Sequence, residues 1–175
     1  YLIRTDADVA QNLLSHLVAY LRVAMPDMRS ISSTVGKEFE LAEHFLRIMQ
    51  IRMGDRLQFT LSCDDTVRDL AMPPAMLISL IENAIKHGLE KATRAGHIHI
   101  SARQESLHMR RQIVIAVVDD GAGLLDNAGQ GVGLVNIHQR LALLYGDDAS
   151  LIVMPNEPQG VDARWAWNRP GGAGY

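Results

Sequence analysis

The chain has 175 residues, of which 47% are hydrophobic, and a formal net charge of −3 at pH 7. This length and composition predict one well-packed globular domain with a further appended segment. The mild acidity argues against a nucleic-acid surface, since no basic stretch is concentrated. The single cysteine, Cys63, excludes an internal disulfide and fits a reducing compartment. The sequence shows neither a signal peptide nor an apolar run long enough to span a membrane.

Residues 6–25 follow a helical pattern with two adjacent apolar stripes. One stripe consists of Val9, Leu13, Leu17, Tyr20 and Ala24, and the other of Ala10, Leu14, Val18, Leu21 and Met25. Together the stripes are wider than a helix needs for packing on one neighbour. Two interpretations follow: a helix shared between an intramolecular contact and a dimer interface, or a central core helix.

The following elements predict a two-layer α+β fold, an α/β sandwich. After a linker at residues 32–34, Thr34 caps a second helix that Gly54 ends. A strand is expected at residues 57–63, and Pro74 is expected at the first position of a helix that runs to Gly88. Two antiparallel hairpins are predicted, residues 97–104 with 112–118 and residues 149–154 with 162–167, together with a helix at residues 134–145.

Three short signatures then indicate a nucleotide site. The first is the helix at residues 78–88, centred on Asn83. The side-chain carbonyl of an asparagine is a hard ligand suited to Mg²⁺ that phosphate oxygens also hold. Lys86 lies three residues further along the helix, where α-helical spacing places its cation on the same face as Asn83.

The second and third signatures are rich in glycine. Asp119 ends a buried strand and can accept a hydrogen bond from an exocyclic amine such as that of adenine, while Gly121 and Gly123 allow a close approach to a flat ring. The run from Gly129 to Leu134 leads into a helix whose N-terminal N–H groups can bind phosphate. Taken singly, each of the three signatures has a simpler interpretation: a polar position on a helix, a turn and a flexible loop. A dinucleotide fingerprint is excluded because its third glycine and preceding strand are missing.

In this order and spacing, the signatures resemble the N, G1 and G2 boxes of the GHKL ATP-binding superfamily, and most closely the LytS-like branch of sensor histidine kinases. Residues 50–57, Gln-Ile-Arg-Met-Gly-Asp-Arg-Leu, resemble the linker into the ATP-binding domain of that branch. The resemblance covers most of the chain and implies a Bergerat ATP-binding fold, with a mixed, mostly antiparallel sheet and helices on one face, preceded by a helical dimerisation segment. It divides the chain into a partial dimerisation and phosphotransfer helix with linker (1–33), a catalytic domain (34–170) and a flexible tail (171–175).

The resemblance also implies the activity. The cofactors would be ATP and Mg²⁺, and the γ-phosphoryl would pass to a histidine upstream of this chain and then to a response regulator. The partners would be a second copy bound through the N-terminal helix and the receiver domain of that regulator, with no nucleic acid. The chain would be the cytoplasmic domain of a membrane-bound protein, touching the membrane only through an upstream region. The implied catalytic residues are Glu82, Asn83 and Lys86, with Asn83 as metal ligand; the implied nucleotide-binding residues are Asn83, Lys86, His87, Gly88, Asp119, Gly121, Gly123, Gly129, Gly131, Val132, Gly133 and Leu134.

Several residues depart from the family patterns. His16 and His44 lack the flanking residues of the phosphoacceptor motif, so the acceptor is expected outside the chain. Ser79 stands where hydrolytic members carry the glutamate that activates water, which favours transfer over hydrolysis. Val161 stands where a threonine hydroxyl usually supports the adenine-binding aspartate, and the lid at residues 124–128 is short. The alternatives are a hydrolytic GHKL ATPase and a catalytically silent, ATP-responsive dimerisation module.

Overall fold

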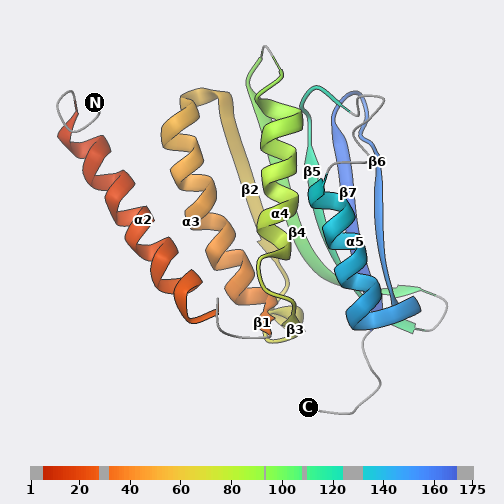
Figure 1. The fold of residues 1–175 in the computed structure, drawn as a ribbon. Helices are drawn as coiled ribbons and strands as arrows, with labels where there is room; N and C mark the ends of the chain where they lie inside the picture. The colour runs from red at the N-terminus through yellow and green to blue at the C-terminus, as the bar shows by residue number, and fades with distance from the viewer. Residues whose placement is uncertain (1–5, 28–31, 93, 108–109, 124–131, 169–175) are drawn as a thin grey trace.

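The computed structural model describes residues 6–27, 32–92, 94–107, 110–123 and 132–168. Figure 1 shows the elements with the labels used here. In chain order they are α2 (Ala7–Asp27), β1 (Ser33–Thr34), α3 (Val35–Met53), η1 (Gly54–Arg56), β2 (Leu57–Cys63), η2 (Asp65–Val67), β3 (Ala71–Met72), α4 (Met76–Asn83), η3 (Ala84–Leu89), β4 (Gly96–Leu107), β5 (Arg110–Asp119), α5 (Val132–Tyr145), η5 (Gly146–Asp148), β6 (Ala149–Pro155) and β7 (Val161–Asn168).

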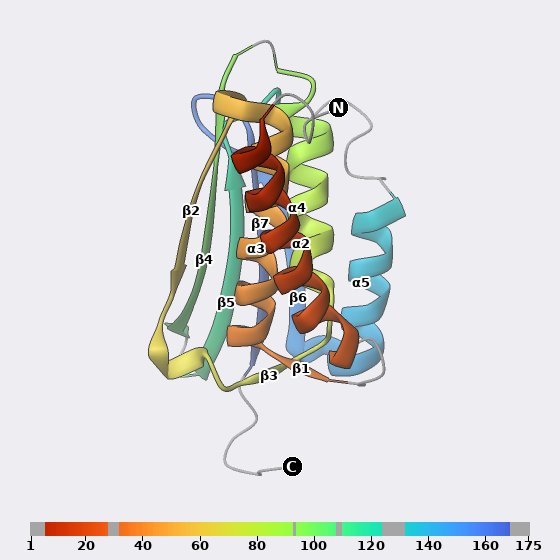
Figure 2. The same cartoon turned by 90° about the vertical axis from the view of Figure 1, so that its left-hand side faces the viewer.

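The main sheet has five strands in the order β2-β4-β5-β7-β6. β2 pairs with β4 in parallel, and the other three pairs are antiparallel. Helices α2, α3, α4 and α5 all lie on one side of this sheet (Figures 1 and 2). The expected α+β architecture, a two-layer α/β sandwich with a mixed and mostly antiparallel sheet, is therefore confirmed. None of the helices in the described ranges is long and apolar enough to cross a membrane.

The core lies between the sheet and the helical layer. Along β5 the two-residue strand period sends Ile113, Ile115 and Val117 into this core, where each is at most 1% exposed. Trp165 and Trp167 on β7 also join the core, with ring centroids 4.7 Å apart. Because Asp119 has the same parity as the three core residues of β5, its side chain points to the helical side of the sheet as well.

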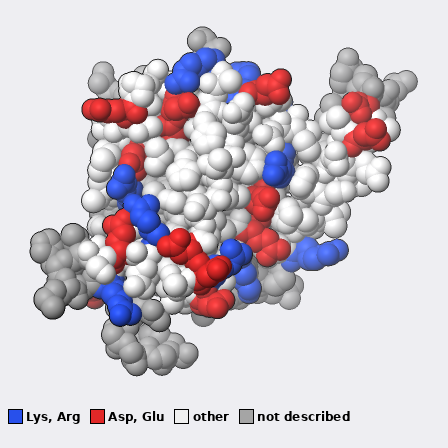
Figure 3. Space-filling model, turned by 180° about the vertical axis from the view of Figure 1, so that it is seen from behind, with Lys and Arg blue, Asp and Glu red and all other residues white. Residues whose placement is uncertain are grey.

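The opposite face of the sheet carries no helix in the part of the chain that is described. Its charged side chains include pairs of opposite sign, such as Arg103 with Glu105 and Arg164 with Asp162. Figure 3 shows this face, with acidic and basic side chains interspersed among uncharged ones. The predicted strand alternation therefore separates an apolar face from a polar face.

Helix α2 packs along the outer side of α3, and its two apolar stripes have different environments. Tyr20 and Ala24 of the first stripe pack against the core, and the Tyr20 ring lies 6.3 Å from that of Phe45. In the second stripe, Leu14 is 61% exposed and Met25 is 63% exposed. The helix is therefore not a central core helix, and its outer stripe has no partner among the described residues.

The ends of α3 agree with the sequence, whereas the start of α4 does not. The Thr34 hydroxyl accepts a hydrogen bond from the Lys37 N–H at 3.3 Å, and Gly54 ends the helix with a φ of 62°. Residues 33–34, predicted as linker, instead form β1, which pairs with β3. The prediction that Pro74 opens α4 is wrong, because Ala75 has a left-handed φ of 62° that separates Pro74 from the first helical residue, Met76.

The cap at Thr34 generates a prediction about stability. Thr34→Ala removes an acceptor for a backbone N–H in the first turn of α3, so we expect the free energy of unfolding to fall by about 1 kcal/mol. Denaturant unfolding followed by circular dichroism measures this change. Thr66→Ala, at an exposed turn position, is the matched control. Equal stability of the two variants would contradict the capping role.

Candidate nucleotide-binding site

A pocket that is partly open to solvent lies between the helical layer and one end of the sheet. α4 and η3 form one wall, and β5, β6 and β7 form the floor. α5 and the loop that follows β5 complete the lining. The lining residues are Leu80, Asn83, Ala84, His87, Gly88, Val117, Asp119, Gly123, Leu134, Val153, Val161 and Ala163.

Asp119 is the acidic group of this pocket and is only 2% exposed. The Gly121 N–H donates to its Oδ1 at 2.9 Å. Burial raises the pKa of Asp119 to about 6; hydrogen bonds from the backbone N–H groups of Gly121 and Val161 oppose this rise, and the nearby Asp120 adds to it. The result is a carboxylate that is ionised at pH 7 at an energetic cost, and that a hydrogen-bond donor from a ligand would stabilise.

Two glycines allow the β5 loop to lie directly on η3. A Cβ atom on Gly88 would stand 2.7 Å from Asp119 Oδ1, and a Cβ atom on Gly121 would overlap the backbone of Gly88. The Ala122 N–H donates to the Gly88 carbonyl at 3.0 Å, which fixes this contact. Gly88 and Gly121, both predicted as site residues, are therefore required by the close approach of two backbones.

The helix carrying Asn83 widens into a π-helix at η3, where the Glu90 N–H donates to the carbonyl of Ile85 at 2.8 Å, five residues earlier. A π-helix has more residues per turn than an α-helix. His87, four residues after Asn83, consequently lines the pocket, whereas Lys86 is exposed and does not. The expected position of Lys86 assumed α-helical spacing, which does not apply to this π-helix. A contact between Lys86 and phosphate therefore stays a prediction. Glu82 is also exposed and outside the lining.

Asn83 brings an unpaired amide into the pocket. Its Nδ2 atom is buried and has no hydrogen-bond partner among the described residues. A buried donor without a partner costs free energy, which a ligand acceptor such as a phosphate oxygen would recover. Burial lowers the pKa of the neighbouring His87, and Lys91 and Lys86 lower it further, so this ring is neutral at pH 7.

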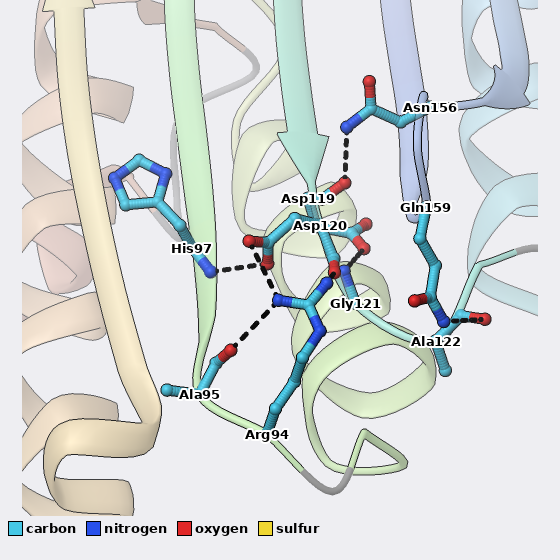
Figure 4. Close-up of polar contacts among 9 residues, drawn as sticks. All are labelled: Arg94, Ala95, His97, Asp119, Asp120, Gly121, Ala122, Asn156 and Gln159. Atoms are coloured by element: carbon cyan, nitrogen blue, oxygen red, sulfur yellow. Dashed lines mark hydrogen bonds and ion pairs between the residues drawn. The ribbon is translucent and has the colours of Figure 1, made fainter.

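The loop after β5 is bound to β4 on one side. Asp120 Oδ1 accepts the His97 N–H at 2.7 Å, and the Asp120 N–H donates to the His97 carbonyl at 3.3 Å. Arg94 contacts the Asp120 carboxylate at 3.4 Å and also donates to its carbonyl (Figure 4). These contacts hold the residue that follows Asp119 against the neighbouring strand.

On the other side, the turn between β6 and β7 binds the same loop. The Asn156 side-chain Nδ2 donates to the Asp119 carbonyl at 2.9 Å, and Gln159 Nε2 donates to the Ala122 carbonyl at 3.3 Å (Figure 4). Sequence reasoning did not predict a role for Asn156 or Arg94, because their partners lie 37 and 26 residues away. No local sequence signal marks such contacts.

The glycine-rich signature is only partly described. Gly129 and Gly131 lie outside the described residues, Val132 and Gly133 begin α5, and Leu134 lines the pocket. The structure thus brings Asn83, His87, Gly88, Asp119, Gly121, Gly123 and Leu134 together at one end of the sheet. Apolar lining residues such as Val153 and Ala163 were not predicted, because strand periodicity does not distinguish them from other core residues.

Sequence comparisons place this chain among sensor kinases. A family model described as histidine kinase matches residues 1–57. The sensor protein LytS of Oceanobacillus iheyensis is 30% identical over 165 residues, which cover 86% of this chain and 28% of that protein. The sensor histidine kinase YesM of Bacillus subtilis is 33% identical over 133 residues, covering 73% of this chain and 22% of that protein. The chain therefore spans about a quarter of the length of these relatives.

Solved structures share the fold. The catalytic domain of histidine kinase ThkA superposes with a TM-score of 0.58 at 16% identity, covering 78% of this chain and 93% of that domain. The histidine kinase domain of the Erythrobacter litoralis blue-light activated kinase EL346 gives 0.57 at 16% identity, covering 89% of this chain and 74% of that domain. The sequence relatives and the shared architecture agree with the three signatures, and the chain belongs to the LytS-like family of sensor histidine kinases.

Proposed function

We propose that this chain binds Mg²⁺-ATP in the described pocket and transfers the γ-phosphoryl to a histidine outside the chain, from which it passes to a response regulator. The observation that carries the proposal is the buried Asp119 carboxylate in the same pocket as the unpaired amide of Asn83. One group suits the amine of a base, and the other suits the oxygens of a phosphate chain or its metal.

Asp119 would recognise the exocyclic amine of adenine. Its Oδ1 already accepts the Gly121 N–H, which orients the carboxylate and leaves further acceptor capacity for a ligand. Leu80 and Val117 supply apolar surface for the ring. Val161 lacks the threonine hydroxyl and supports Asp119 through its backbone N–H alone.

Asn83 would hold the metal through its side-chain carbonyl oxygen, and its unpaired Nδ2 fits a neighbouring acceptor. Mg²⁺, when bound, supplies charge neutralisation at the phosphate oxygens. Gly129, Gly131, Val132 and Gly133 would present N–H groups to these oxygens at the start of α5. Lys86 would add a cation from the exposed side of η3.

In the transfer step, a histidine ring nitrogen forms a bond to the γ-phosphorus while the bond to the bridging oxygen breaks and ADP leaves. The exposed Glu82 would accept the proton released by that ring. Ser79 occupies the position where a water-activating carboxylate would lie, and its hydroxyl donates to the Ala75 carbonyl at 3.0 Å within the helix. This arrangement favours transfer to a protein nucleophile over hydrolysis.

A second copy of the chain would cover the exposed stripe of α2. The stripe runs through Leu14, Val18, Leu21 and Met25, each at least 45% exposed, and two such helices packed together would bury it in a bundle. Residues 1–33 would thus be the dimerisation part and residues 34–170 the catalytic part. The receiver domain of the response regulator is the second proposed partner, and the parent protein is proposed to be membrane-bound with this part in the cytoplasm.

Asp119→Asn should weaken ATP binding about tenfold or more, because the amide loses the charged acceptor and can present a donor to the adenine amine. Calorimetry at pH 7.5 with Mg²⁺ measures the dissociation constant, expected between micromolar and millimolar for the wild type. Asp162→Asn is the matched control, since Asp162 is also a buried aspartate but pairs with Arg164 on the other face of the sheet. An Asp119→Asn protein with wild-type affinity would rule out the adenine contact.

ATP affinity should depend on pH through Asp119. Because its pKa lies at about 6, protonation below that pH removes the charged acceptor, and the ratio of wild-type to Asp119→Asn affinity should fall towards one, by at most tenfold per pH unit. Because both proteins bind the same nucleotide, this ratio cancels the effect of titrating the ATP phosphates on the affinity. Because the folded-state pKa lies above the unfolded value, protonation of this group relieves a destabilising buried charge as pH falls through 6, so Asp119 itself does not drive unfolding there. A ratio independent of pH from 7.5 to 5 would contradict the assignment.

Asn83→Ala should lower phosphoryl transfer by about a hundredfold or more, because the metal ligand is lost. The measurement is labelling from γ-labelled ATP onto a separately supplied phosphoacceptor helix, with His16 and His44 expected to stay unlabelled. Gln58→Ala, which removes an exposed side-chain amide from β2, is the control and should transfer normally. Normal Mg²⁺-dependent labelling by Asn83→Ala would reject the role of Asn83.

A further inference from the structure

We propose that Asn156 is a positioning residue for Asp119, and that the turn between β6 and β7 thereby sets how well the pocket selects a base with an exocyclic amine. The inference rests on the proposed ATP-binding function. It starts from a contact outside the three signatures: the Asn156 Nδ2 atom donates to the backbone carbonyl of Asp119 at 2.9 Å.

The position of Asp119 at the end of β5 makes this contact consequential. Asp119 pairs in register with Ile98 on β4 and Val161 on β7, and the chain leaves the sheet immediately afterwards. Beyond a strand end, individual contacts such as those of Asp120 with His97 restrain the backbone, in place of a continuous ladder of hydrogen bonds on both sides. A small rotation there moves the carboxylate, so a bond to the carbonyl of Asp119 itself restrains the group that would read the base.

The backbone of Asn156, whose side chain is the donor, is also restrained. The Asn156 N–H donates to the Gly160 carbonyl at 3.0 Å, which closes the turn. Gly160 has a φ of 115°, and a Cβ atom there would overlap the Asp119 carbonyl oxygen. Only glycine permits this approach, so the turn lies directly against the backbone of Asp119. Asn156 therefore has a fixed backbone from which its amide reaches the carbonyl.

The other contacts of the loop act on different residues. On the β4 side, His97 and Arg94 hold Asp120. On the helix side, Gly88 holds Ala122, which also accepts a hydrogen bond from Gln159. Asn156 is partly buried in a turn and lies outside the core cluster. Removing its amide should therefore loosen the carboxylate while leaving the sheet intact.

The test compares two nucleotides that differ at one group. ATP carries an amine at the 6-position of the purine, whereas inosine triphosphate carries an oxygen that the Asp119 carboxylate would repel. The wild type should prefer ATP. Asn156→Ala should reduce this preference by about tenfold, the order of one hydrogen bond to a charged group, because ATP loses affinity and inosine triphosphate does not.

A purely structural role of Asn156 would change both affinities equally and leave their ratio unchanged. Gln112→Ala is the matched control. It removes the hydrogen bond from the side-chain amide of Gln112 to Asn168, between β5 and β7 at the opposite end of β5, and should keep the ratio of the two affinities. Asn156→Asp, which keeps the shape of the side chain but replaces the donating amide with an acceptor, should reduce the ratio in the same direction, and it decides between the outcomes if Asn156→Ala does not fold.

Two negative results are distinguishable. A wild type with no preference for ATP over inosine triphosphate would reject the adenine assignment, and this inference with it. A wild-type preference that persists in Asn156→Ala, or in Asn156→Asp where the first variant does not fold, would reject only the positioning role.

Discussion

The buried carboxylate of Asp119 is the constraint on which the arrangement of this site depends. An ionised group that is 2% exposed is costly unless hydrogen bonds compensate for the lost water. Its compensation comes from backbone N–H groups of Gly121 and Val161. Three separate elements, the β5 loop, η3 and β7, must consequently meet at one point, and this is possible because Gly88, Gly121 and Gly160 present no side chains there.

The π-helical turn follows from the same meeting point. The backbone of Gly88 must reach the β5 loop, where it accepts the Ala122 N–H, while Ile81 and Ile85 stay buried in the core. A wider turn allows both. It also means that a single continuous helical segment carries both Asn83 and Gly88. The spacing between these two residues is therefore set by helix geometry rather than by a flexible loop.

Much of this architecture could be predicted from local pattern, because strand alternation and helix caps depend on neighbouring residues alone. Thr34, Gly54 and both hairpins are confirmed for that reason. Features that depend on distant partners could not be predicted: the strand order, the π-turn that leaves Lys86 outside the pocket, and the bond from Asn156 to Asp119. The motifs indicated several residues that line the pocket, such as Asn83, Gly88 and Asp119, whereas the residues that hold Asp119 were visible only in three dimensions.

The helical layer also lies between the exposed surface of α2 and the pocket that contains Asp119. Tyr20 packs on α3, and its pKa is raised by burial and then by the carboxylates of Glu82 and Glu38. The Tyr20 hydroxyl therefore lies within electrostatic range of Glu82, the residue next to Asn83. One face of α2 therefore interacts electrostatically with α4, while its other face carries the exposed Leu14 and Met25. Through this electrostatic interaction, the packing of α2 against α3 bears on the charge surroundings of Glu82.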